Sequence, residues 1–219
     1  MTVRRFLIPC TLGTILWIGL VYAAEQSVQW EQFSASLRDY FDYPTPKNAK
    51  IAYQYLPASG HVRMKGLEIE RETLELFNTN SRILERQVIS GDAESVRLAF
   101  RLFSITDAAY TEELDILLGK LIRINPKLFL RELVANQNLV IGNLEGLLGN
   151  EGEEYVDRFK AQCLENSLRR KALQSVTDSL LTRKRDECLN ELDRQWQTYC
   201  AANNRLPSDA PQPPVPGQR

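Results

Sequence analysis

Hydrophobic residues recur three or four positions apart through most of the chain after residue 66, and this spacing is typical of α-helices. The clearest example is the apolar face formed by Val96, Ala99, Phe100 and Phe103, with Asp92 placed as the N-cap of the same helix. Alternating apolar and polar positions, which would indicate strands, are scarce. The pattern predicts an all-α protein.

The segment from residue 67 to residue 150 is the predicted helical core. After the helix that contains Val96 and Phe103, three more helical runs are predicted in this segment. The middle one of these three begins at Asn125-Pro126, where proline suits the first helical position. Their apolar faces contain Leu114, Leu117, Leu118 and Leu121, then Phe129, Leu130, Leu133 and Val134, then Val140, Ile141, Leu144, Leu147 and Leu148. Short helices joined by short turns predict stacked antiparallel hairpins, arranged as an irregular solenoid or a compact bundle.

Two helices and a loop are expected in residues 24–66. The first runs over about 27–40, and the second begins at Thr45-Pro46 and ends before Pro57. Residues 67–89 then read as helix, with a possible break at 78–80, where three poor helix formers adjoin.

Residues 151–205 are predicted to form a long, charged C-terminal helical arm. Heptad-like spacing in its last part indicates packing against another helix, in this chain or in a partner chain. The residues with this spacing are Leu189, Leu192, Trp196 and Tyr199.

The segment 206–219 contains five prolines, which predicts an extended, mobile tail. It holds two P-x-x-P sequences, Pro211–Pro214 and Pro213–Pro216, of the form that aromatic grooves bind. A plain flexible terminus is the simpler interpretation, because such spacings arise readily in any proline-rich stretch.

The first 23 residues have the composition of a secretory signal peptide. Arg4 and Arg5 precede an uncharged apolar stretch, and small residues at Val21 and Ala23 place the cut after Ala23. An uncleaved anchor in the inner membrane is the alternative, since the apolar stretch approaches the length of a membrane span. Either way we expect the body of the protein outside the cytoplasm, periplasmic or secreted, with membrane contact only through an uncleaved N-terminal segment.

Charge argues against nucleic acid as a partner. The 219 residues include 27 Lys and Arg against 28 Asp and Glu, and removal of the signal peptide leaves 25 against 28. Phosphate binding needs surplus basic residues gathered on one face. The two basic clusters, Arg169-Arg170-Lys171 and Arg183-Lys184-Arg185, would share a face only if one unbroken helix joined them.

Cys163, Cys188 and Cys200 remain in the mature chain, in a compartment where disulfides form. Cys188 and Cys200 would lie about 18 Å apart on one helix, too far to pair. A bridge must then use Cys163, and we expect Cys188 as its partner because the shorter loop closes more easily. The alternatives are Cys163 with Cys200, or three buried thiols.

Candidate catalytic groups are few. His61 is the single histidine and has no neighbouring acid, and no ligand spacing for a metal is present. The acidic residues after Asn150 fit the start of a helix better than a calcium loop. We expect no cofactor.

These observations favour a non-enzymatic binding or scaffold protein of the bacterial cell envelope, which contacts another envelope protein or a second copy of itself. The residues expected at such a contact are those of the heptad-like stripe and the two basic clusters. The alternative is an envelope hydrolase with paired carboxylates, for which Glu68, Glu70, Glu72 and Glu75 form a candidate group.

Overall fold

The computed structural model describes residues 29–56, 68–103, 105–106, 108–140, 144–149, 155 and 158–201. Every regular element in these residues is a helix, with no strand among them, so the all-α prediction is confirmed. The stacking of repeated hairpins stays a prediction. The predicted signal peptide, His61 and the tail 206–219 lie outside the described residues.

The first helices form where local signals place them. Residues 29–42 are helical, and their buried side chains include Phe33, Leu37 and Tyr40. Helix α2 (Pro46–Tyr55) begins with proline in its first turn, while the Thr45 side chain accepts a hydrogen bond from the Asn48 backbone amide. The Thr45 side chain satisfies a backbone amide of the first turn, and the fixed φ angle of Pro46 suits the helical conformation there. The helix therefore begins where the sequence predicts.

Helix α3 (Glu68–Ile89) is continuous, so the break considered at residues 78–80 is absent. Two polar side chains there bond to carbonyls of the preceding turn: Thr79 Oγ1 to Glu75 and Asn80 Nδ2 to Leu76. Buried Phe77 and Leu84 on either side anchor the helix to the core. Tertiary packing therefore overrides the weak local propensity.

Helix α5 (Ala108–Ile124) is the centre of the fold. It contacts α3, α4 (Ala93–Leu102), α6 (Pro126–Ala135), α8 (Leu144–Gly149) and α9 (Phe159–Gln174). The predicted cap of α4 is confirmed, because the Asp92 side chain accepts a hydrogen bond from Ser95 N. Helix α6 begins at Pro126 as predicted, and the Asn125 side chain accepts from Leu128 N. The last predicted run of the core is divided, with α7 (Gln137–Val140) and α8 as separate short helices.

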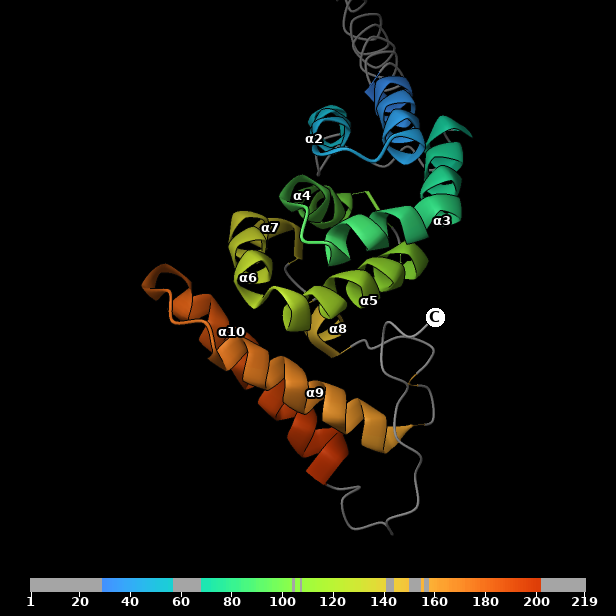
Figure 1. Cartoon of the computed structure of the whole chain (residues 1–219). Helices are drawn as coiled ribbons and strands as arrows, with labels where there is room; N and C mark the ends of the chain where they lie inside the picture. The colour runs from blue at the N-terminus through green and yellow to red at the C-terminus, as the bar shows by residue number, and fades with distance from the viewer. Residues whose placement is uncertain are drawn as a thin grey trace, which may run out of the picture.

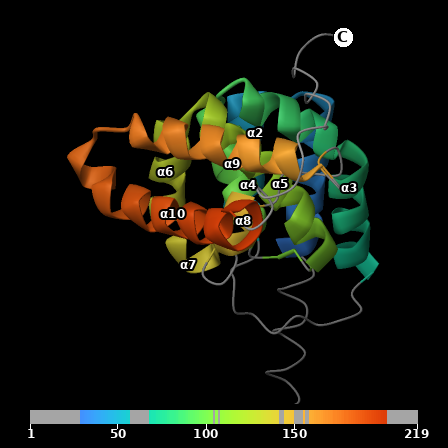
Figure 2. The same cartoon turned by 90° about the horizontal axis from the view of Figure 1, so that it is seen from below.

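The C-terminal helices lie together at one end of the molecule (Figure 1). Helix α9 is followed by a short 3-10 helix, η2 (Ser179–Leu181), by α10 (Thr182–Gln195) and by a π-helical turn, η3 (Trp196–Cys200). Seen from below in Figure 2, α9 and α10 run side by side, and α10 contacts α8. One buried cluster extends from Trp30 to Leu192, so these helices share a single core with the rest.

Candidate functional site

The C-terminal hairpin exists because α9 stops at Gln174 and the chain reverses before Thr182. The turn is fixed at two points: the Asp178 side chain accepts from Leu180 N, and Arg185 Nη1 donates to the Val176 carbonyl at 2.8 Å. Buried Leu173 and Leu181 pack into the core on either side of the reversal. The segment 171–183 is thus not one helix, and the two basic clusters lie on different helices.

A disulfide closes the open end of this hairpin. It joins Cys163 to Cys200, with Cα atoms 5.6 Å apart, and Cys188 is a free, buried thiol. The expected Cys163–Cys188 pairing is therefore wrong. In an antiparallel hairpin the register decides which residues lie level, and Cys163, near the start of α9, lies level with the end of η3. Burial raises the pKa of the Cys188 thiol to about 12, which keeps it protonated and unreactive.

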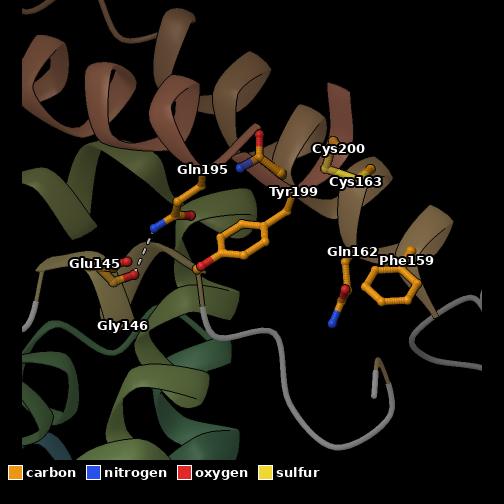
Figure 3. A pocket seen from close by; sticks show the side chains of 10 residues that line it. Glu145, Gly146, Phe159, Gln162, Cys163, Gln195, Tyr199 and Cys200 are labelled. Atoms are coloured by element: carbon orange, nitrogen blue, oxygen red, sulfur yellow. Dashed lines mark hydrogen bonds between the residues drawn. A yellow bond between two sulfur atoms is a disulfide. The ribbon is translucent and has the colours of Figure 1, made fainter. Parts of the chain in front are cut away.

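The disulfide borders a cleft of about 450 Å³ between α8 and the hairpin (Figure 3). The cleft is lined from α8 by Glu145, Gly146 and Gly149, from α9 by Phe159, Gln162, Cys163 and Asn166, and from α10 and η3 by Gln195, Tyr199 and Cys200.

Two aromatic rings and several carboxamides give the cleft its chemistry. Phe159 is 54% exposed and Tyr199 is 56% exposed, so both rings in the lining are accessible to a ligand. The Gln162 side chain, on the same wall as Phe159 in Figure 3, makes no hydrogen bond to any described residue. Such a surface offers ring faces for packing and an amide for directional hydrogen bonds.

Gln195 fixes the distance between α10 and α8. Its Nε2 donates to the Glu145 carbonyl at 2.9 Å and to Glu191 Oε1 at 3.0 Å. A Cβ at Gly149 would lie 2.8 Å from Gln195 Oε1, so glycine at that position permits the close approach. The far wall is fixed by Asn166, 5% exposed, whose Nδ2 donates to the Leu192 carbonyl at 3.2 Å.

Behind the cleft, a buried arginine ties α9 to α8 and α5. Arg169 is 1% exposed; its Nε donates to Glu165 Oε1 at 3.2 Å and its Nη1 to the Leu148 carbonyl at 2.7 Å. Arg123 donates to the other Glu165 oxygen at 2.8 Å. A Cβ at Gly119 would lie 2.9 Å from the Arg169 guanidinium, so α5 makes room for this side chain with a glycine.

The predicted contact residues divide between core and surface. Leu192 is fully buried and Arg169 nearly so, and the prediction that they touch a partner is therefore wrong; both pack within the chain's own hairpin. Leu189 packs partly against the core and Trp196 lies half-buried, 6.0 Å from the Arg170 guanidinium. Tyr199 alone of the stripe lines the cleft. Partner contact by Leu189, Trp196 and Tyr199 stays a prediction.

Most basic side chains of the two clusters form ion pairs with neighbouring acidic residues. Arg170 pairs with Asp193, and Arg183 and Lys184 both pair with Glu187. Arg185 pairs with Asp186, while Lys171 is exposed. Their charges do not add up to one basic stripe.

Among the described residues, carboxylates do not converge in the cleft. Glu145 is the one acidic residue of the described lining, and it pairs with Arg194 on the rim at 2.8 Å. The carboxyl with the strongest perturbation is Asp115 on α5, where burial, with repulsion from Glu112, raises the pKa to about 7. Asp115 is 7% exposed, and its Oδ1 has no hydrogen-bond partner in the part of the chain that is described. Glu72 and Glu75 are exposed on α3.

Sequence reasoning missed Phe159, Gln162 and Gln195 as site residues. Phe159 and Cys163 are four residues apart in the sequence, a spacing that indicates an apolar helix face packed inward, whereas the structure leaves Phe159 54% exposed. Only the hairpin register and the place of α8 bring these residues together.

Within the described ranges no group of three or more His, Cys, Asp or Glu side chains could hold a metal ion, and none of the helices there has the length and apolar character to cross a bilayer. Comparison with family models, with characterised proteins and with solved structures finds no match to this chain.

Proposed function

We propose that the protein is a non-enzymatic binding or scaffold component of the bacterial cell envelope, and that it holds another protein at the cleft between α8 and the C-terminal hairpin. The observation that carries the proposal is the exposure of the Phe159 and Tyr199 rings in one cleft, together with the Gln162 carboxamide, which makes no hydrogen bond to a described residue. Aromatic rings flanked by hydrogen-bonding groups are the residues that dominate protein interfaces.

The composition of the lining supports binding over hydrolysis. A carboxylate hydrolase needs an acid and a base on opposite sides of the bond that is cleaved. The part of the lining that the structure describes presents one carboxylate, Glu145, which is already paired with Arg194, and amides do not exchange protons near neutral pH.

The same proposal includes a location outside the cytoplasm, in the cell envelope. A disulfide at the cleft agrees with an oxidising compartment, where such bonds persist. We expect the mature chain to begin at Ala24 and to occur in the envelope fraction. N-terminal sequencing of the protein from its own cells tests this, and a chain that keeps Met1 in the cytosol would contradict it.

Site-specific photo-crosslinking tests the partner. A photoreactive amino acid replaces Tyr199 in the full chain, and a matched chain carries it at Tyr43, which is 72% exposed and lies at the end of the first helix. We expect an adduct of one defined mass from position 199 and none from position 43. The partner identified in this way should bind the purified protein at least tenfold more weakly after Phe159→Ala, and unchanged after Tyr43→Ala. Equal adducts from both positions would refute the proposed function.

A further inference from the structure

The chain leaves its last described helix at the edge of the cleft. Tyr199 and Cys200 line the cleft, and Ala201, the last described residue, follows directly. The disulfide fixes Cys200 at this edge, and residues 202–219 follow Ala201 directly in the sequence. The described chain thus ends at the cleft, with eighteen residues of sequence still to follow.

The chemistry of that segment matches the chemistry of the cleft. Residues 206–219 include five prolines and two overlapping P-x-x-P sequences, and such chains favour the polyproline II conformation, whose carbonyls have no internal hydrogen bonds. Grooves that bind polyproline II chains do so with aromatic rings that pack on prolines and with side-chain donors for the carbonyls. Phe159 and Tyr199 supply the rings, and the Gln162 amide supplies a donor.

The length of the segment is sufficient. Residues 202–205 can span roughly 14 Å when extended, which is room to reverse direction after Ala201. Six residues of polyproline II then extend about 19 Å, enough to cross a cleft of this size.

We propose that the proline-rich segment 206–216 of this chain docks in the cleft between α8 and the C-terminal hairpin and competes there with the protein partner. The competition rests on the proposed function, whereas the docking itself does not. A short tether gives an effective concentration on the order of 1 mM. For a segment that binds with a dissociation constant near 100 µM, the tethered copy weakens binding of a free copy about tenfold.

A labelled peptide with the sequence of residues 204–219 provides the test. Its binding is measured by fluorescence anisotropy to the full chain and to a full-length variant in which Pro211, Pro213, Pro214 and Pro216 are replaced by serine. We expect the variant to bind the peptide about tenfold more tightly, because its own segment no longer fills the cleft. Equal affinity for the two chains, or binding to neither, would overturn the proposal.

Two controls locate the docking. In the serine variant, Phe159→Ser should abolish peptide binding and Tyr43→Ser should leave it unchanged; both side chains are more than half exposed, so both variants should fold, which circular dichroism checks. Binding that survives Phe159→Ser would place the peptide elsewhere and overturn the proposal. Loss of the tenfold difference on dilution would assign the docked segment to a second copy and overturn docking within one chain.

The outcomes separate the two proposals. Peptide competition without a crosslinked partner at position 199 would uphold docking and refute the proposed function. A crosslinked partner at position 199 without peptide competition would uphold the proposed function and refute docking of the proline-rich segment.

Discussion

Asp115 provides the sharpest test of how α8 is held against the core. This carboxyl on α5 is buried, its Oδ1 has no hydrogen-bond partner among the described residues, and its Oδ2 lies so close to α8 that a Cβ at Gly146 would be 2.6 Å away. Burial raises its pKa from 3.8 to about 7, with repulsion from Glu112 as the smaller cause. The fold therefore prefers the neutral acid.

The sign of the pH dependence follows from that preference. Below about pH 4 the carboxyl is protonated in the folded and the unfolded chain, and it has no effect on the pH dependence. Between pH 4 and pH 7 the unfolded chain loses the proton while the folded chain keeps it, so the free energy of unfolding falls as pH rises. Above pH 7 the loss is complete. A pKa that moves from 3.8 to about 7 corresponds to about 4 kcal/mol over this range.

The Asp115→Asn variant removes the charge and keeps the shape. We expect its free energy of unfolding to equal that of the wild type near pH 4 and to exceed it by up to about 4 kcal/mol at pH 8. Urea denaturation followed by circular dichroism at pH 4, 6 and 8 measures the difference. The control is Glu113→Gln, which removes a charge from an exposed position on the same helix and should change stability by less than about 0.5 kcal/mol at every pH. A difference between Asp115→Asn and wild type that stays constant from pH 4 to pH 8 would refute the reasoning.

Three further predictions concern the walls of the cleft. Replacing Cys163 and Cys200 by serine opens a loop with a sequence separation of 37 residues. The free energy of unfolding, measured in urea, should fall by about 4 kcal/mol. Reductant should lower the free energy of unfolding of the wild type by the same amount and leave the variant unchanged. Arg169→Met leaves Glu165 and the Leu148 carbonyl with fewer partners, and we expect a loss of about 3 kcal/mol by the same assay, while a loss below 1 kcal/mol would contradict the buried network. Gly146→Ala places a methyl group against Asp115 and should lower the melting temperature, and Asp115→Ser in the same chain should restore it; a variant as stable as wild type would contradict the close approach.

The parts of the fold that the sequence predicts are those fixed by neighbouring residues. Thr45-Pro46, Asp92 and Asn125-Pro126 each begin a helix because the cap and the first turn lie within four residues of one another. The same local reasoning fails at residues 78–80, where packing of Phe77 and Leu84 keeps α3 intact. Intrinsic helix propensity therefore determines where a helix begins or ends only where the burial of side chains does not.

The candidate site depends on distances along the chain that local patterns do not encode. The partner of Cys163 was predicted from loop length, but the antiparallel register of α9 and α10 selects Cys200, since the chain reverses between Gln174 and Thr182. Arg169 reads as one of three consecutive basic surface residues, yet it is buried because Glu165 and the Leu148 carbonyl satisfy its guanidinium. Both outcomes follow from contacts between helices that are far apart in sequence.

Helix α8 shows why the cleft and the disulfide belong together. A helix of six residues is far too short to be stable in water alone, so its position depends on its neighbours. Gln195 on α10 and Arg169 on α9 bond to its carbonyls, while Asp115 on α5 lies against Gly146. Two of these three contacts come from the C-terminal hairpin, whose open end is closed by Cys163 and Cys200. Reduction of that bond should therefore loosen α8 as well as η3, because the hairpin that holds α8 loses its constraint. We therefore expect the walls of the cleft to be fully in place only while the bond between Cys163 and Cys200 is intact.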